Sequence, residues 1–376
     1  MKYAYEWAPK WEPIITDESI EETRSLIGIP LRRRHFNNEA SRIAIVTFAR
    51  NIGDRNPLYL GEEYGIGTKW GCMIAPPTWL YSVDDTVIAP KLRGIHTLYA
   101  GAKWEFYRPV RLGDKITPEA CLVDVQEKKG EFCGRMVMQI GQVIYRNQGG
   151  EDIAKVRSKV MRCPRGEAKK RGKYMGIKKH RYSSEEVMAI EEGYDAENIR
   201  GADIRYWEDV AIGEEFTTVV KGPLTAEDVL LFVNITRPIQ PFALAYQHRL
   251  RHPADFYHNP ETGLPDFSMA CLIDDAMAQQ CGFPYAHDHG TQRVSWMANL
   301  LTNWIGDDGW LKMLNVEIRR PDIYGDTTWC KGKVLDKELQ GEEHIVRLQV
   351  WAENQRGEVT AQGEATATLL SRMLKT

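Results

Sequence analysis

The chain has 376 residues, of which 43% are hydrophobic and 27% are charged, and its formal net charge is −3. This length fits two domains of ordinary size, and the composition supplies enough apolar material for two cores. The small net charge gives no reason to expect binding to nucleic acid or to a membrane surface. No segment has the roughly 18 uninterrupted apolar residues of a spanning helix.

The seven cysteines are scattered along the sequence and form no CxxC pair. An odd, scattered set predicts reduced thiols rather than a disulfide framework or a zinc site. The first residues lack the basic region and apolar run of a secretory signal, so none is expected. These features together predict a cytoplasmic protein that binds no metal.

The first half predicts one helix followed by long antiparallel strands. Pro77 in the segment PPTWLYS suits the first turn of a helix. The segment WEFYRPVRLGD, from Trp104 to Asp114, then reads as a strand that ends in a Gly-Asp turn. Residues 144–162 read as a strand, an Asn-Gln turn with glycine, and a second strand.

A basic segment separates the two halves of the chain. Residues 162–181 are rich in Lys and Arg, and SSEEVMAIEEG after them reads as a short capped helix. One interpretation is a solvated linker, and a second is a basic edge that meets the phosphates of a carrier such as coenzyme A. The predicted division is a domain over residues 1–162, a linker over 163–202 and a domain over 203–376.

The second half repeats the pattern of the first. Apolar residues recur every three or four positions in QRVSWMANLLTNWIG, residues 292–306, which predicts a helix. VEIRRPDIYGD at residues 316–326 and WAENQRGEVTAQGEATATL at residues 351–369 match the strand segments of the first half. We therefore expect two sheets, each curled around its own helix and paired edge to edge, because such pairing hides exposed edges.

Four segments resemble the MaoC-like (R)-specific enoyl-thioester hydratase superfamily. They are FARNIGDRNPLYLGEEYG at 48–65 and GCMIAPPTWLYS at 71–82, which resemble its amino-terminal dehydratase domain, and HGTQRVSWMANLLTNWIGDDGWL at 289–311 and RRPDIYGDTTWCKGKV at 319–334. The resemblance implies an α+β double hot-dog fold, with two antiparallel sheets each wrapped around a central helix. It also implies acyl-CoA or acyl-carrier-protein thioesters as ligands, with CoA as substrate carrier and no other cofactor. The resemblance further implies a homodimer or a hetero-oligomer with another hot-dog subunit.

The family's active site uses the motif D-x-N-P-x-H, whose Asp and His hold a water and move protons. A backbone N–H at the start of the hot-dog helix meets the enolate oxygen. The first half keeps Asp54 and Asn56 of this motif but has Tyr59 at the His position. Pro76 and Pro77 at its predicted helix start carry no N–H. The first half is therefore predicted to be a ligand-binding or structural copy.

In the second half, Pro238 and Ala243 occupy the positions of the motif's Asp and His. Other histidines and carboxylates gather near the family's oxyanion position instead, where a His beside a carboxylate suits acid–base chemistry. A purely structural role, in capping the helix and satisfying a buried loop, is the alternative for each. The catalytic candidates are His289, Gly290, Asp274, His287 and Asp54, and the substrate-binding candidates are Asn56, Tyr59, Asp288 and His258.

The leading functional hypothesis is an enoyl-CoA hydratase or 3-hydroxyacyl-CoA dehydratase with altered acid–base residues. The rich aromatic content suits either ordinary cores or a deep apolar pocket. Within the resemblance, a deep pocket and the insertion at residues 237–270 fit a bulky fatty or steroid-derived acyl group. One alternative is a hot-dog thioesterase, in which a carboxylate directs water to the carbonyl carbon. The other is a non-catalytic acyl-thioester-binding subunit that needs a partner chain. Fold alone does not separate these three hypotheses.

Overall fold

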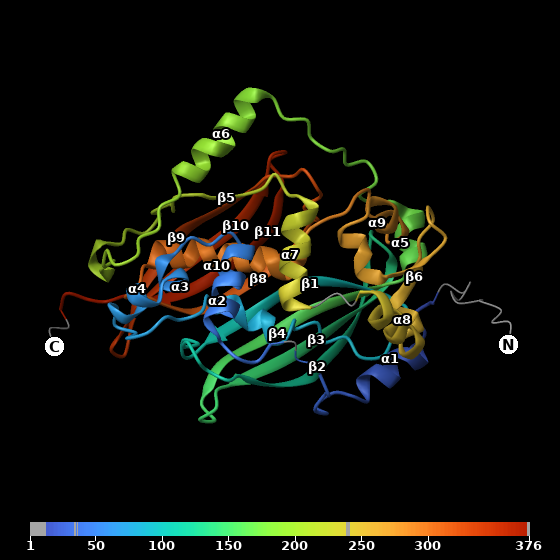
Figure 1. Ribbon diagram of the computed structural model, residues 1–376, viewed down its shortest axis with the longest axis horizontal. Helices are drawn as coiled ribbons and strands as arrows, with labels where there is room; N and C mark the ends of the chain where they lie inside the picture. The colour runs from blue at the N-terminus through green and yellow to red at the C-terminus, as the bar shows by residue number, and fades with distance from the viewer. Residues whose placement is uncertain (1–12, 34, 36, 238–240, 374–376) are drawn as a thin grey trace.

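The computed structural model describes residues 13–373, apart from residues 34, 36 and 238–240 (Figure 1). The first twelve residues, on which the expectation about a secretory signal rests, and Pro238 lie outside the described residues. In the described ranges, no helix is both long enough and apolar enough to cross a bilayer.

The first half of the chain consists of short helices followed by long strands. Its elements are α1 (Asp17–Arg24), α2 (Arg42–Asn51), α3 (Pro57–Leu60), α4 (Glu62–Ile66), the 3₁₀ helix η1 (Pro77–Ser82), β1 (His96–Phe106), β2 (Thr117–Gly130), β3 (Gly134–Arg146) and β4 (Asp152–Cys163).

Two helices follow β4 in the basic segment, and the second half comes after them. The elements of the basic segment are α5 (Arg165–Arg171) and α6 (Ser184–Asp195). Those of the second half are η2 (Trp207–Asp209), β5 (Val219–Lys221), α7 (Ala226–Thr236), α8 (Phe242–Arg251), η3 (Pro253–Asp255), β6 (Phe256–His258), β7 (Pro265–Phe267), η4 (Ser268–Leu272), α9 (Asp275–Gln280), α10 (Gly290–Ile305), β8 (Trp310–Ile318), β9 (Thr328–Gln340), β10 (Glu343–Asn354) and β11 (Val359–Thr368).

The long strands of both halves form one antiparallel sheet in the order β2-β3-β4-β1-β8-β11-β10-β9-β5. The two halves meet where β1 pairs with β8, from Gly101 opposite Glu317 to Glu105 opposite Met313. The predicted edge-to-edge pairing is therefore confirmed. A hairpin of β6 and β7 forms a separate two-stranded sheet.

The predicted internal repeat extends to individual hydrogen bonds. In both halves, the Asp of the Gly-Asp turn accepts from the backbone N–H three residues before it and from a Gln in the following hairpin. The contacts are Arg111 N to Asp114 Oδ2 at 2.8 Å, Gln148 Nε2 to Asp114 Oδ1 at 3.0 Å, Ile323 N to Asp326 Oδ2 at 3.1 Å and Gln355 Nε2 to Asp326 Oδ1 at 2.7 Å. The same hydrogen bonds thus stabilise the Gly-Asp turn in both halves.

The predicted second-half helix is α10, which starts at Gly290 and ends before Gly306. Every residue of α10 after Gly290 is buried. The helix packs on β8, β9 and β10 of its own half and on β1 of the first half, and Figure 1 shows it lying across the strands of the second half. A helix buried all round is fixed in position by both halves.

The prediction of an equivalent long helix in the first half is wrong. The segment after Pro77 forms only the 3₁₀ helix η1, and the chain then runs irregularly to β1. Asp84 and Asp85 accept hydrogen bonds from the backbone N–H groups of Thr86 and Val87, at 2.8 Å and 3.0 Å. Such side-chain contacts compete with helical hydrogen bonds and end the turn.

The basic segment packs on the body of the protein rather than lying free along its whole length. The predicted capped helix is α6, which has a capping box at Ser183 and Glu186. It lies at the top of the view in Figure 1 and contacts β5 at the edge of the sheet. Lys169 and Lys179 contact the side chains of Gln280 and Asp275. The exact domain limits stay a prediction.

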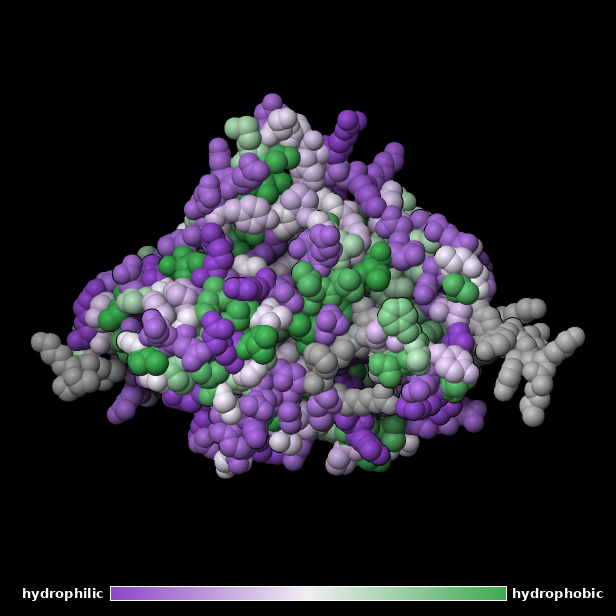
Figure 2. All heavy atoms as spheres, viewed as in Figure 1, coloured by the Kyte–Doolittle hydropathy of each residue, from purple (hydrophilic) through white to green (hydrophobic). Residues whose placement is uncertain are grey.

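Most of the face shown in Figure 2 is hydrophilic, with apolar side chains gathered over α7 and near α8. Leu231 of α7 and Phe242, Leu244 and Leu250 of α8 are exposed there.

Gly101 lies at the seam between the two halves, with a φ of 140° and an ideal Cβ position 2.2 Å from the Val316 carbonyl oxygen. We expect Gly101→Ala to cost about 3 kcal/mol or more, because the added methyl group forces β1 away from β8. Gly150→Ala is the control: its φ is 77° but its Cβ meets nothing within 4 Å, so it should cost only about 1 kcal/mol. Urea unfolding midpoints measure both, and equal losses would contradict the close-approach argument.

Candidate functional site

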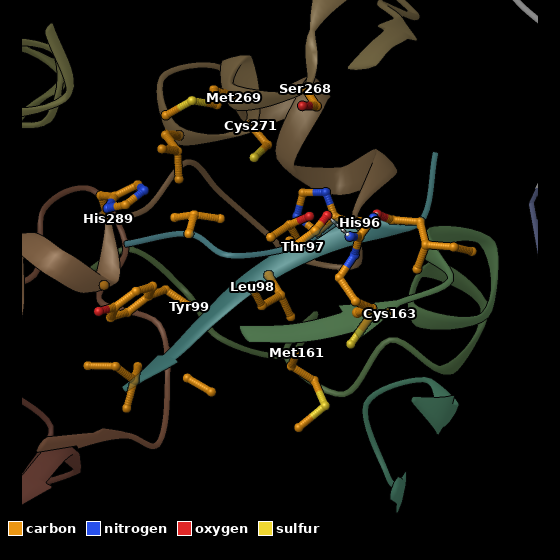
Figure 3. A pocket seen from close by; sticks show the side chains of 18 of the residues that line it. His96, Thr97, Leu98, Tyr99, Met161, Cys163, Ser268, Met269, Cys271 and His289 are labelled. Carbon is orange, nitrogen blue, oxygen red and sulfur yellow. Dashed lines mark hydrogen bonds between the residues drawn. The ribbon is translucent and has the colours of Figure 1, made fainter. Parts of the chain in front are cut away.

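A cavity with a volume of about 620 Å³ is lined by both halves of the chain. Its walls come from β1, the end of β4, the start of α10, the segment of residues 254–272 and the turn after β8. Figure 3 shows His96 toward one end of this stretch of β1, and Tyr99 with His289 toward the other. This volume lies in the range that binds small-molecule ligands.

The start of α10 forms one wall of the cavity. Gly290 is its first residue, and among the described residues the Gly290 N–H has no hydrogen-bond acceptor. First-turn N–H groups of a helix lack intrahelical partners and carry partial positive charge. Tyr99 of β1 packs on Gly290 so closely that a Cβ there would lie 3.0 Å from Tyr99 Cβ. Because Gly290 has no Cβ, the first turn of α10 can pack directly against β1.

His289 directly precedes this helix and lines the cavity. Its Nδ1 lies 2.6 Å from Thr291 Oγ1, and its ring lies 6.4 Å from the rings of Tyr99 and Phe232. Removal from water lowers the pKa of His289 to about 4, although the charge of Asp85 opposes this shift. His289 is therefore neutral at pH 7, and Nε2 is free to accept a proton when Nδ1–H donates to Thr291.

Asp288 has a structural role in this turn. Its carboxylate accepts from Arg293 Nε at 2.9 Å and also from Arg293 Nη2. Arg293 is buried and donates further to the carbonyls of Arg320 and Thr360, at 2.7 Å and 2.9 Å. A buried carboxylate committed to such a pair holds the start of α10 against the loop after β8.

His287 also lines the cavity, but its ring packs against Phe283 with 4.3 Å between centroids. Burial lowers the pKa of His287 to about 4. Its backbone bridges Ile323, which mirrors the bridge between Ile74 and Arg111 in the first half. The same backbone pairing thus precedes α10 in the second half and η1 in the first half.

Asp274 and His258 lie outside the set of residues that line this cavity. Asp274 caps α9, because its Oδ1 accepts from the Met277 N–H at 3.0 Å. His258 is exposed at the end of β6. Ala243 lies in α8, a helix without buried residues.

The first-half candidates form a separate group around a second cavity of about 40 Å³, which Asn56 and Tyr59 line. Asp54 is buried, and its Oδ1 accepts from the Asn56 N–H at 2.9 Å. Among the described residues its Oδ2 has no hydrogen-bond partner. Burial raises the pKa of Asp54 to about 6, although Lys221 opposes this shift. None of the residues that the structure describes lines both cavities.

Sequence reasoning missed the cavity residues on β1 and in the 254–272 segment. Within β1, His96 is buried beside apolar residues, and Tyr99 bonds Thr86 Oγ1 at 2.9 Å. Cys271 and Tyr257 line the same cavity. The sequence signal that could have found these cavity residues is a polar residue on the buried face of a predicted strand.

Asp54→Asn should stabilise the protein more at pH 8 than at pH 4. A carboxyl whose folded-state pKa of about 6 exceeds its ordinary value of 3.8 costs stability as the pH rises through that window. The unfolding free energy of the variant minus that of the wild type should therefore increase by up to about 3 kcal/mol between pH 4 and pH 8. Denaturant unfolding at the two pH values measures it, and a difference independent of pH would contradict the burial argument.

Comparisons with known proteins agree with this architecture. Residues 25–156 match the FAS1-like dehydratase domain region. A 3-hydroxybutyryl-CoA dehydratase of Methylorubrum extorquens is 33% identical over 78 residues, which is 21% of this chain and 50% of that protein. The chain therefore spans about half the length of this curated relative.

Two solved structures share the fold of nearly the whole chain. A MaoC-like dehydratase has a TM-score of 0.65 and 16% identity, over 93% of this chain and 100% of that one. A Mycobacterium tuberculosis protein with a double hotdog fold has a TM-score of 0.51 and 9% identity, over 89% of this chain and 94% of that one. The predicted resemblance is thus confirmed: the chain has the double hot-dog fold, and residues 25–156 match the FAS1-like dehydratase domain region.

Proposed function

We propose that the protein is an enoyl-thioester hydratase or 3-hydroxyacyl-thioester dehydratase that works in the 620 Å³ cavity. One observation carries the proposal: the N–H of Gly290, which has no acceptor among the described residues, stands beside the imidazole of His289 on the cavity wall. A donor and a base side by side are what stabilising an enolate and moving a proton require.

In the hydration direction, His289 Nε2 takes a proton from water while the water oxygen bonds to C3 of the enoyl thioester. The C2–C3 π electrons move toward the carbonyl, and the enolate oxygen accepts the Gly290 N–H. The imidazolium of His289 then returns its proton to C2, which restores the neutral side chain. Dehydration is the reverse sequence, with the C2 proton removed and the C3 hydroxyl leaving as water.

The cavity supports an acyl-CoA as the substrate. Its volume admits a bulky acyl group, and its lining includes exposed cations that suit the phosphates of CoA. These cations are Arg32, Lys91, Arg93, Arg319 and Arg320. Within this proposal CoA is the carrier and no other cofactor takes part, and a cytoplasmic location and pairing with a second hot-dog chain remain expectations from the sequence.

One observation favours a second candidate, a non-catalytic acyl-thioester-binding subunit. Among the described residues, only Asp255 and Asp288 supply carboxylates to the cavity lining, and each is engaged, Asp255 with His248 and Asp288 with Arg293. In this part of the chain, the lining therefore has no uncommitted carboxylate to serve as the usual partner in the family's acid–base pair. The same observation weighs against a thioesterase, which needs a carboxylate to direct water.

His289→Gln should lower kcat for hydration of an α,β-unsaturated acyl-CoA by about 10²-fold or more, because the amide accepts no proton. Loss of enone absorbance measures the reaction. Asp54→Asn should keep its activity, because Asp54 does not line the 620 Å³ cavity. If Asp54→Asn lost activity and His289→Gln kept it, the active site would instead lie in the first half.

The same assay separates the other candidates. Release of free CoA thiol without loss of the enone would show a thioesterase. Binding of the acyl-CoA without turnover, and turnover only with an added hot-dog chain, would show a non-catalytic subunit.

Arg93→Glu should raise KM for an acyl-CoA at least tenfold and leave KM for the matching N-acetylcysteamine thioester unchanged. Arg93 is exposed at the cavity, and only the CoA ester carries phosphates for it to contact. Steady-state kinetics with the two thioesters at low salt measure the effect, since salt screens exposed charges. An equal change for both substrates would contradict phosphate recognition.

A further inference from the structure

Three potential metal ligands meet at the end of the large cavity away from His289. They are His96 of β1, Cys271 of η4 and Cys281 just after α9, and all three are buried. One ligand atom from each lies within 4.8 Å of the other two. His96 Nδ1 lies 3.5 Å from Cys281 Sγ.

These separations fit a tetrahedral ion. Bonds of about 2.3 Å to sulfur and about 2.0 Å to nitrogen at tetrahedral angles place S and N about 3.5 Å apart. The distance between His96 Nδ1 and Cys281 Sγ already has this value. Thiolate and imidazole ligands together favour zinc over magnesium or calcium.

A fourth coordination position would face the cavity. His96 and Cys271 both line that cavity, and Figure 3 shows both side chains on its wall. The nearby Tyr257 hydroxyl lies 3.2 Å from His96 Nδ1, so metal binding requires the imidazole to give up this contact. Three protein ligands and an open position are the arrangement of zinc sites that accept water or a substrate atom.

Two arginines lie near the cluster, and the charge of Arg165 favours the thiolate of Cys281. Arg165 lies over the ring of Tyr257, with its Cζ 4.0 Å from the centroid. Arg162 donates to the carbonyls of Ala89, Leu92 and Ile95 at 2.8, 2.6 and 2.8 Å. Two thiolates and a neutral imidazole would balance the charge of a divalent ion.

We propose that His96, Cys271 and Cys281 bind one zinc ion, whose open position faces the cavity. This site revises the sequence expectation of no metal, and it does not depend on the proposed activity. It would hold a water or a donor atom of the cavity's ligand next to a Lewis acid.

Cobalt substitution tests the site in the full-length chain, purified with a tag that contains no histidine. The chelator-treated protein should take up one Co²⁺ per chain, with a thiolate-to-cobalt charge-transfer band and the visible bands of a tetrahedral ion. Zinc should displace the cobalt and remove both. Elemental analysis of protein from zinc-supplemented cells should find about one zinc per chain after dialysis.

Cys271→Ser and Cys281→Ser should each lower the charge-transfer amplitude to half or less. Cys163→Ser is the matched control, because Cys163 is also buried, lines the same cavity and lies outside the cluster. It should keep the full spectrum. The wild-type spectrum decides the matter even if a serine variant fails to fold. A wild-type chain without the charge-transfer band, or a band that survives both serine substitutions, overturns the proposal.

Discussion

The pairing of β1 with β8 is the constraint on which the rest of the structure depends. It joins the two halves into one sheet, and it removes two edges that would otherwise expose unpaired backbone groups. The same strand, β1, contacts α10 and lines the large cavity. The close approach at Gly101 therefore positions the cavity wall as well as the seam.

The two copies of the repeat have diverged at their central segments. Pro76 and Pro77 offer no N–H in the first half, where the chain forms only a 3₁₀ helix. The second half has His289 and Gly290 at the start of a fully formed helix. The second half thus has a glycine N–H at the start of its central helix, whereas the first half has no such donor at its two prolines.

Buried charge sets the geometry at that helix start. Arg293 is paired with Asp288 and with Asp322, whose carboxylate lies 3.1 Å from Arg293 Nε. Taking these ions out of water is costly, so their value lies in fixing one arrangement more than in stability. The arrangement orients the turn that carries His289 and leaves Asp288 no freedom to act as its acid–base partner.

Periodicity and turn residues within short stretches of chain predicted the repeat and the long second-half helix. The resemblance carried by four short segments implied the double hot-dog fold and pointed to His289 and Gly290. The three-dimensional structure shows that the first half has only the 3₁₀ helix η1 in place of a long helix and that Asp54 lies apart from His289. It alone brought His96 next to Cys281, 185 positions away, because sheet pairing and packing, rather than local sequence pattern, choose which distant side chains share a cavity.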